Sequence, residues 1–493
     1  MEHTSSTFQV PSDYSPCNDE AYALEFSSAE EVQALVSRVD TYFRGHFTLG
    51  VEFRIRQLKA LRSWLKSHEV EVLQALTDDL GKAPFEGYAT ELGIVYDEIR
   101  TCLANVRKWS SPKGANSLSA SVVHFPSTSK VYASPMGTIG IMSPWNYPLQ
   151  LALVPLVDAI CAGNCVVLKP SQTSPHTSAL LRKMCQEAFD SRHVFCLPAG
   201  GAMNDWILEC KFDKIFFTGS PNIGKKIMHA AADTLTPVTL ELGGKSPCFI
   251  DKTANIKRAA QRIAWGKCIN SGQTCVAPDY FLVHEDVVDE FINQMKVYLH
   301  KYYGADILKS EEYPHIVNKR HFDRVCGLID NHGPNARVAL GGGRDPETLK
   351  IEPTIMTGVS FDDPVMKEEI FGPVMPILTW NDATRKTLLD IPRKFGHPLA
   401  CYVFSEDKAF QKQVIDWVPF GGATINDVVI HLANNKMGFG GFGNSGMGAY
   451  HGKVGFDCFT HYKSTLTKGN LIELPVRVPP FGNKIALLRL LMR

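Results

Sequence analysis

The sequence predicts an α/β protein with two facing units, each built on a largely parallel sheet. Short apolar segments alternate with helical segments from residue 138 to residue 232, and the same alternation resumes after Pro237. Strands that are apolar throughout and separated by helices are typical of parallel sheets buried on both faces. The length of 493 residues exceeds what one hydrophobic core usually spans, so we expect at least two structural units.

The composition argues against several classes of protein. Lysine plus arginine number 51 and aspartate plus glutamate also number 51, so the net charge does not favour nucleic acid as a partner. The 13 cysteines are scattered and odd in number, and no secretory leader precedes them, so we expect a cytoplasmic protein. No CxxC pair or histidine cluster accompanies Cys161 and Cys165, so we expect no metal site.

The N-terminal part predicts a tail followed by helices and strands. Residues 1–25 are rich in Ser, Thr, Pro and acidic side chains, which is typical of a mobile tail. The capping-box pattern from Ser28 to Glu31 predicts the first helix, and apolar residues at helical spacing from Ile55 to Leu65 predict the second. Strands are expected at 119–132, with a bend at Pro126.

Two series of strands and helices follow. The first series predicts strands at 138–142, 165–168 and 214–217, and helices at 149–162, 178–189 and 222–232. The second predicts strands at 238–240, 247–250, 280–284 and 399–404, and helices at 256–268, 287–302 and 408–416. A glycine-rich segment at 438–448 and a strand-like segment at 456–466 close the second unit. The final residues, 484–493, are very apolar with three cations, and we expect them to form a short helix.

The segment 268–275 contains two candidate nucleophiles, Cys268 and Cys275. A reactive thiol needs access and nearby donors for its anion, whereas structural cysteines usually lie in apolar surroundings. Cys275 follows the small and polar residues of a segment that we expect to be flexible, and Cys268 ends an apolar helix. These surroundings favour Cys275.

Four other motifs could carry chemistry, each with a plain structural alternative. FFTGSPNIG (216–224) is a strand, a glycine turn and a helix start that could receive a phosphate, or only a tight connection. Lys169 ends a strand on the edge where such sheets bind ligands, or is solvated there. Glu241 could act as a general base or lie on the surface, and Asn146 could stabilise an oxyanion or merely form a turn.

Taken together, these motifs resemble a known family. PWNYP, LKPS, FTGSPNIG, ELGGKSP, SGQTC and EEIFGP occur in the order and approximate spacing of the aldehyde dehydrogenase superfamily, and the resemblance runs from about residue 28 to the end. Within the family, the segments 441–453 and 426–431 and the short helical N-terminus resemble the class 3 branch. That branch includes fatty-aldehyde dehydrogenases and fungal apocarotenal dehydrogenases.

The resemblance implies roles for individual residues. Cys275 corresponds to the nucleophile, Asn146 and the Cys275 backbone N–H to the oxyanion hole, and Glu241 to the base that activates water. The cofactor, NAD or NADP, is implied to contact Lys169 and Gln172 on the adenosine side, Gly219, Ser220 and Gly224 at the phosphates, and Glu369 and Phe371 beside the nicotinamide ribose.

Two positions depart from the family pattern. The family often has glutamate after LKPS, where it binds both hydroxyls of the adenosine ribose, and this chain has Gln172. Loss of that negative charge lessens repulsion of a 2'-phosphate, so we expect NADP to be tolerated. Gly438 stands where class 3 sequences usually have proline, and we expect it only to loosen a loop.

The resemblance also implies the domain organisation. We expect a cofactor-binding domain at 26–118 and 134–240, a catalytic domain at 241–455, an oligomerisation flap at 119–133 and 456–475, and a tail helix at 476–493. The flap would join two copies into a homodimer. The tail helix would cover the chain's own substrate funnel or its dimer partner, or it would touch a membrane surface.

The implied reaction is oxidation of an apolar aldehyde to the carboxylic acid by NAD(P), with an aliphatic, aromatic or isoprenoid aldehyde as substrate. Two alternatives remain open. In a coenzyme A acylating dehydrogenase a thiol would replace water, although Glu241 argues against this because it would hydrolyse the thioester. A catalytically silent scaffold could also keep the fold.

Overall fold

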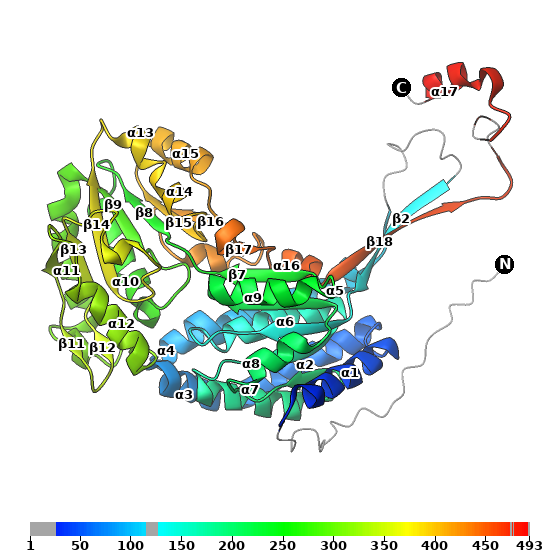
Figure 1. Cartoon of the computed structure of the whole chain (residues 1–493), viewed down its shortest axis with the longest axis horizontal. Coiled ribbons are helices and arrows are strands. Elements are labelled where there is room, and N and C mark those ends of the chain that lie inside the picture. Colours follow the sequence, from blue (N-terminus) through cyan, green and yellow to red (C-terminus); the bar gives the residue numbers. More distant parts are fainter. Residues whose placement is uncertain (1–25, 115–126, 474–475, 477, 492–493) are drawn as a thin grey trace.

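The computed structural model describes residues 26–114, 127–473, 476 and 478–491. The predicted mobile tail at 1–25 and most of the strand region expected before residue 127 lie outside the described residues. Two α/β units make up the body of the molecule, and a narrow ribbon of strands projects from one end (Figure 1). Within the described part of the chain, no helix is long and apolar enough to cross a membrane.

The first unit is built on a six-stranded sheet in the order β17-β7-β6-β3-β4-β5. All neighbouring strands are parallel except β17, which pairs antiparallel with β7. The strands are β3 (Thr138–Met142), β4 (Cys165–Lys169), β5 (Val194–Cys196), β6 (Lys214–Gly219), β7 (Val238–Leu242) and β17 (Gly446–Met447). The predicted α/β fold is therefore confirmed in this unit, although β5 and β17 were not expected.

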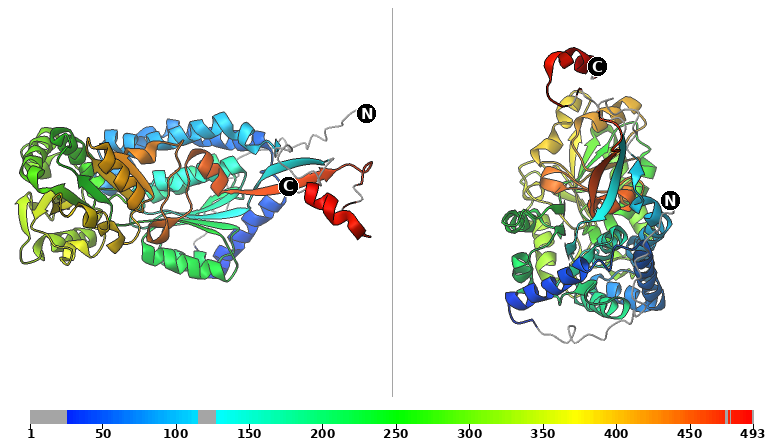
Figure 2. Two further views of the ribbon diagram at one scale, coloured as in Figure 1. Left: turned by 90° about the horizontal axis from the view of Figure 1, so that it is seen from above. Right: turned by 90° about the vertical axis from the view of Figure 1, so that its right-hand side faces the viewer.

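Helices cover both faces of this sheet (Figures 1 and 2). They are α1 (Ala29–Arg44), α2 (Val51–Ser67), α3 (Glu69–Leu80), α4 (Pro84–Gly87), α5 (Gly93–Ser110), α6 (Gln150–Ala162), α7 (Pro175–Ala188), α8 (Met203–Trp206), α9 (Pro221–Ala232) and α16 (Gly452–Cys458). A π-helical turn, Tyr88–Leu92, joins α4 to α5. Helix α6 is buried along its whole length, which explains its uniformly apolar sequence.

The second unit contains a seven-stranded sheet in the order β10-β13-β14-β9-β8-β15-β16. Only the β10–β13 pair is antiparallel. The strands are β8 (Pro247–Ile250), β9 (Tyr280–His284), β10 (Arg337–Leu340), β13 (Thr354–Thr357), β14 (Val374–Trp380), β15 (Ala400–Phe404) and β16 (Gly422–Ile425), with a separate pair β11 (Arg344–Asp345) and β12 (Lys350–Ile351).

The helices of this unit flank the seven-stranded sheet (Figure 1). They are α10 (Ile256–Cys268), α11 (Val288–Tyr303), α12 (Lys319–Asp330), α13 (Arg385–Leu388), α14 (Ile391–Lys394) and α15 (Lys408–Trp417). The expected helix at 256–268 and the expected strand at 280–284 begin and end where the structure has them. Their apolar periods are strong and their ends carry polar residues, which is why these bounds were predictable.

The projecting ribbon is a three-stranded antiparallel sheet in the order β1-β2-β18. Its strands are β1 (Lys113–Gly114), β2 (Ser127–Pro135) and β18 (Thr460–Lys468). The strand expected at 456–466 was placed too early, because residues up to Cys458 belong to α16. The sequence predicts a bend at Pro126 and Ser127. Ser127 is instead the first residue of β2, and residue 126 lies outside the described residues.

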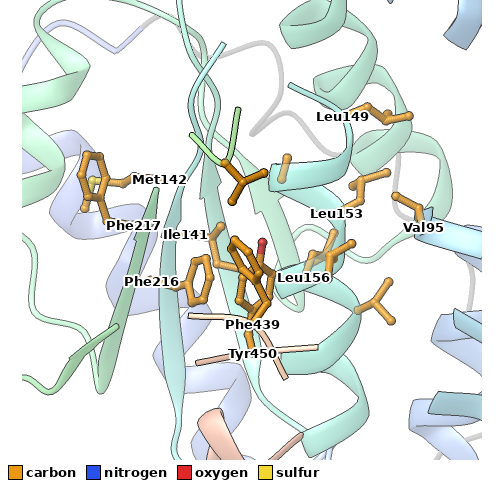
Figure 3. Packing of buried hydrophobic residues seen from close by; sticks show 14 of the residues in the cluster. Val95, Ile141, Met142, Leu149, Leu153, Leu156, Phe216, Phe217, Phe439 and Tyr450 are labelled. Atoms are coloured by element: carbon orange, nitrogen blue, oxygen red, sulfur yellow. The ribbon is translucent and has the colours of Figure 1, made fainter. Parts of the chain in front are cut away.

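Two local expectations need correction. Ser28 occupies the N-cap of α1 without a side-chain capping bond, and it is Ser27 that donates its backbone N–H to Glu31 Oε2 at 2.7 Å. The boundary of the second unit at residue 455 is also wrong, because β17 and α16 return to the first unit. Figure 3 shows Tyr450 beside Phe216 of β6, with ring centres 5.0 Å apart.

The tail helix α17 (Ile485–Leu491) lies beyond the end of the ribbon, far from the two units (Figures 1 and 2). The apolar side chains of Ile485 and Leu490 are exposed. The helix therefore does not cover a substrate funnel of its own chain. A contact with a dimer partner or with a membrane surface stays a prediction.

Candidate active site

One cavity of about 690 Å³ lies where the two units meet, and residues from both of them line it. The predicted site residues among its lining are Asn146, Gly219, Ser220, Glu241, Cys275, Glu369 and Phe371. Lys169, Gln172 and Gly224 are not among them. The fold thus brings together residues that are up to 225 positions apart in the chain (146 to 371).

Cys275 and Cys268 have different surroundings. Cys268 is fully buried at the end of α10, and burial raises its pKa. Cys275 is half-buried and borders two cavities, the one described above and a second, apolar one. Of these two thiols, only Cys275 can be reached from a cavity.

The segment before Cys275 is not flexible, contrary to the expectation from its sequence. Asn270, Ser271 and Gly272 have φ angles of 49°, 51° and 73°, and residues 270–273 are all buried. A Cβ on Gly272 would lie 2.4 Å from the carbonyl oxygen of Gly372. The small residues therefore permit a tight left-handed turn pressed against another loop, and left-handed backbone is found where the surroundings enforce it.

The polar side chains of this turn satisfy buried backbone groups. Gln273 donates from Nε2 to the carbonyl oxygens of Asn270 and His315, both at 3.0 Å, and accepts the Val317 N–H at 3.0 Å. Buried polar groups normally find such partners. The polar side chains that suggested a mobile segment instead bond the turn before Cys275 to its surroundings.

Asn146 lies on the turn between β3 and α6 and is buried. Its side-chain amide donates to the Gln273 carbonyl oxygen at 3.0 Å, and its own carbonyl oxygen accepts from Asn270 Nδ2 at 2.7 Å. An amide nitrogen carries two hydrogens, so one remains to serve the cavity. Two hydrogen bonds thus join the turn of Asn146 to the turn before Cys275.

Glu241 lies in β7 with only 2% of its surface exposed. Neither carboxylate oxygen has a hydrogen-bond partner among the described residues, and burial raises its pKa well above the usual range. A buried carboxyl group without partners is costly. Its position in the wall of the cavity is therefore evidence for a functional group.

Burial also raises the pKa of the Cys275 thiol, with smaller contributions from Glu369 and Glu241. The backbone N–H groups of Cys275 and Val276 oppose this rise, because they hydrogen-bond to the sulfur. Like charges in a buried site disfavour each other. The thiolate therefore forms most readily while the two neighbouring carboxyl groups are protonated.

Glu369 and Phe371 lie on the loop before β14. The Glu369 carboxylate accepts the Gly244 N–H, and burial raises the pKa of this group to about 8. A Cβ on Gly243 would lie 1.9 Å from Glu369 Oε2, so only glycine allows this approach. Phe371 has a φ of 48° and contacts the Trp145 ring edge to face, with ring centres 5.4 Å apart.

A buried ion pair that the sequence did not reveal supports this loop. Lys245 bonds to Asp279, and its Nζ also donates to the carbonyl oxygens of Val365 and Glu368 at 3.2 and 2.9 Å. Asp279 in turn accepts the Ile370 N–H at 2.8 Å. Lys245 stands in the ELGGKSP motif, but its partner is 34 residues away, so no local signal identified the pair.

The glycine turn before α9 lines the first cavity. Ser220 caps α9 without a side-chain bond. Pro221 has no N–H and the Ile223 N–H already bonds to the Ser220 carbonyl oxygen at 3.1 Å, so the Asn222 N–H is the donor that the first turn leaves available. Thr218 Oγ1 is buried without a partner among the described residues and lines the same cavity. These unpaired donors fit the pyrophosphate of a dinucleotide.

The remaining predicted residues fall into two groups. Gly224 is buried, and a Cβ there would lie 2.9 Å from Leu242, so this glycine allows α9 to approach β7. Lys169 is buried, not solvated, and bonds to Asn204, and burial lowers its pKa to about 8. Gln172 is exposed beside it.

A second cavity, of about 140 Å³, opens on the other side of Cys275. Its walls come from the π-helical turn, α6, α10 and the segment 429–451, and they are mostly apolar. The lining includes Ile94, Tyr147, Leu151, Trp265, Ile269, Val429, Ile430, Leu432, Phe439 and Tyr450. Cys275 thus borders one cavity with many charged and polar lining residues and a second whose walls are almost wholly apolar, an arrangement suited to a polar cofactor and an apolar substrate.

Gly438 precedes this apolar wall and has a φ of 72°. Proline is fixed near −65°, so it cannot adopt this conformation. The backbone conformation at residue 438 therefore differs from the one that a proline at this position would require.

Comparisons with known proteins identify proteins similar to this chain. The model of the aldehyde dehydrogenase family matches residues 3–465. The 4,4'-diaponeurosporen-aldehyde dehydrogenase of Staphylococcus aureus is 42% identical over 447 residues, which cover 90% of this chain and 95% of that protein. The dimeric NADP-preferring aldehyde dehydrogenase of Rattus norvegicus is 40% identical, covering 91% and 98% of the two chains.

A solved structure shows the same likeness. The substrate-bound state of Staphylococcus aureus AldH superposes with a TM-score of 0.91 and 40% sequence identity, covering 95% of this chain and all of that one (100%).

Proposed function

Because this chain belongs to the aldehyde dehydrogenase family and resembles its class 3 members, we propose that it oxidises an apolar aldehyde to the carboxylic acid through a thioester on Cys275. The observation that carries the proposal is that Cys275 borders both a large cavity with many charged and polar lining residues and a small, almost wholly apolar one. The acid and the reduced cofactor are the products of the reaction.

In the first step Cys275 Sγ attacks the carbonyl carbon of the aldehyde and forms a thiohemiacetal. The carbonyl oxygen becomes an oxyanion, which Asn146 Nδ2 and the Cys275 N–H stabilise by hydrogen bonds. Such donors are most effective when they are held before the charge develops. The bonds between the Asn146 turn and the Cys275 turn support this preorganisation.

Loss of the hydride on the former aldehyde carbon, which bound NAD or NADP would accept, turns the thiohemiacetal into the thioester. In the second step Glu241 removes a proton from water, and the water oxygen attacks the thioester carbon. The C–S bond breaks, the acid leaves, and Cys275 is regenerated. A carboxyl group in apolar surroundings has a raised pKa, which makes it a stronger base once ionised. A coenzyme A acylating enzyme would have no use for this group.

The cofactor, NAD or NADP, supplies a hydride acceptor when bound. Ser220 and the first turn of α9 would hold its phosphates, Lys169 its adenosine-side ribose, and Glu369 and Phe371 its nicotinamide-side ribose. Gln172 carries no charge, so it does not repel a 2'-phosphate. We therefore propose that both cofactors are used.

The apolar cavity supports a medium-length or long aliphatic, aromatic or isoprenoid aldehyde as substrate. Its walls offer few hydrogen-bonding groups, and apolar surface gains most from burial of an apolar chain. The relative from Staphylococcus aureus is named for an isoprenoid aldehyde, and this name adds support for that class.

An aldehyde panel graded by chain length, assayed with NAD and with NADP, tests the proposal. We expect kcat/KM to rise with chain length, a burst of reduced cofactor, and loss of both in Cys275→Ala. Equal kcat/KM for acetaldehyde and decanal would refute the apolar substrate class. Absence of turnover with every aldehyde would leave only a silent scaffold.

We also propose that the chain forms a homodimer through its projecting ribbon and that α17 contacts the partner or a membrane surface. A flotation assay with liposomes compares the full chain with a chain ending at residue 483. Flotation of the full chain alone supports the membrane contact, and equal behaviour of both excludes it.

A further inference from the structure

We propose that Lys82 and Glu91 are positioning residues that hold Asn146 where it can stabilise the oxyanion. This inference rests on the oxyanion role proposed above for Asn146. Lys82 Nζ and Glu91 Oε1 are 2.5 Å apart, and both side chains are fully buried (0% exposed). Lys82 contacts the turn that carries Asn146. Neither Lys82 nor Glu91 lines the first cavity, the one of about 690 Å³.

Lys82 contacts this turn at Asn146. Its Nζ donates to the Asn146 carbonyl oxygen at 3.1 Å and lies 4.0 Å from the centre of the Tyr147 ring. Tyr147 in turn shares a hydrogen bond of 2.6 Å with Thr274, the residue before the nucleophile. One ammonium group therefore contacts the oxyanion donor and a residue bonded to the nucleophile's turn.

Glu91 contacts the C-terminal end of the same turn. Its Oε2 accepts the N–H groups of Leu149 and Gln150 at 2.9 and 3.1 Å, where α6 begins. A carboxylate at a helix N-terminus also interacts favourably with the helix dipole. Since Oε1 of the same carboxylate binds Lys82, both ends of the segment 146–150 are fastened to one ion pair.

The local backbone explains how Glu91 reaches this place. It belongs to the π-helical turn Tyr88–Leu92, a rare structure that is frequent at functional sites. Ala89 and Thr90 of the same turn line the apolar cavity, whereas Glu91 does not. The π-helical turn thus forms part of the wall of the apolar cavity. It also places the Glu91 carboxylate against the start of α6.

The burial of two charges needs a reason. Desolvation of a buried ion pair often cancels the attraction, so apolar residues of similar volume can be as stabilising. Apolar residues could not bond to the Asn146 carbonyl or to the N–H groups of Leu149 and Gln150. Catalytic groups must be held to within about 0.5 Å of their working position, and charge-assisted hydrogen bonds are strong enough to do so.

The double variant Lys82→Met/Glu91→Gln tests the inference. It removes the Lys82 donor to the Asn146 carbonyl oxygen, which keeps its bond from Asn270, and it removes both charges of the pair together. The amide oxygen introduced at position 91 keeps an acceptor for the start of α6. We expect the pre-steady-state burst of reduced cofactor to slow on the order of 10- to 100-fold. The KM for the cofactor and the rate at which iodoacetamide alkylates Cys275 should stay within about twofold of the wild-type values.

Two further variants separate the possible outcomes. Val414→Ala, in the second unit's core and outside both cavities, reports on general loss of stability, and Asn146→Ala reports on the oxyanion donor itself. A double variant whose burst matches wild type, or whose burst and alkylation rate fall together as in Val414→Ala, overturns the inference. If Asn146→Ala has the wild-type burst, the role of Asn146 fails and this inference fails with it.

Discussion

At the scale of single residues, the site combines groups whose charged forms are disfavoured until the reaction needs them. Burial raises the pKa of Glu241 and of Cys275, and these two groups line one cavity. Two anions close together in a buried site repel each other. The arrangement therefore favours use of the thiolate and the carboxylate one after the other.

The raised pKa of Glu241 leads to a prediction about pH. Because its base form increases as the pH rises, we expect kcat of the wild type to increase from pH 7 to pH 9 when thioester hydrolysis limits turnover. In Glu241→Gln, kcat should fall about 100-fold or more, while the burst of reduced cofactor persists. Stopped-flow and steady-state rates measure the two steps. A loss of the burst in this variant would contradict the role in hydrolysis.

Gln172 provides a prediction about the cofactor. In Gln172→Glu the new carboxylate would repel a 2'-phosphate and accept hydrogen bonds from ribose hydroxyls. We expect the ratio of kcat/KM for NADP to that for NAD to fall about tenfold or more. Gln172→Ala serves as the control, since it removes the amide without adding charge. Strict use of NAD by the wild type would contradict the prediction.

At the scale of elements, the turn before Cys275 shows how a short segment is held by its neighbours. Three consecutive residues, 270–272, have left-handed backbone. Asn270 bonds to the turn of Asn146, and Gln273, the next residue, bonds to residues 315 and 317. The isolated segment would not keep this conformation, because non-glycine residues disfavour it. The conformation therefore depends on contacts made by the rest of the chain.

Gly272→Ala tests this dependence. Its left-handed backbone alone should cost about 1–3 kcal/mol, and the added Cβ would meet the carbonyl oxygen of Gly372 at 2.4 Å. We expect a lower Tm and altered alkylation of Cys275. Gly50→Ala is the matched control, because a Cβ there meets nothing within 4 Å. Equal Tm values for the two variants would show that the turn is not strained.

At the scale of the whole molecule, the projecting ribbon exposes an edge strand. Strand β18 lies at an edge of the three-stranded sheet and is exposed over most of its length. Exposed edge strands readily pair with another chain. The ribbon therefore supports the proposed homodimer, in which a second copy would cover this surface.

Leu466→Arg tests the dimer. Leu466 lies in β18 and is 50% exposed, and a charge there would oppose burial against a second copy. We expect sedimentation velocity to show a shift from dimer to monomer at micromolar concentration. Leu235→Arg is the control, since Leu235 is 90% exposed and lies outside the ribbon. A monomeric wild type, or a dimeric Leu466→Arg, would contradict the prediction.

The sequence alone determined the α/β fold class and most elements with strong apolar periods, and it favoured Cys275 over Cys268 as the candidate nucleophile. These features depend on local patterns: helix α10 and strand β9 each carry a clear period, and the two thiols differ in their immediate neighbours. Motifs such as ELGGKSP and SGQTC also identified candidate residues before their positions in space were known.

Only the tertiary structure decided the other features. The pairs Lys82–Glu91 and Lys245–Asp279, the return of β17 to the first unit, the rigid turn before Cys275 and the position of α17 all depend on the surroundings that other segments create. Burial and hydrogen bonding are properties of those surroundings. A lysine or an asparagine looks the same in a sequence whether it is solvated or enclosed, so its role follows from what the fold places around it.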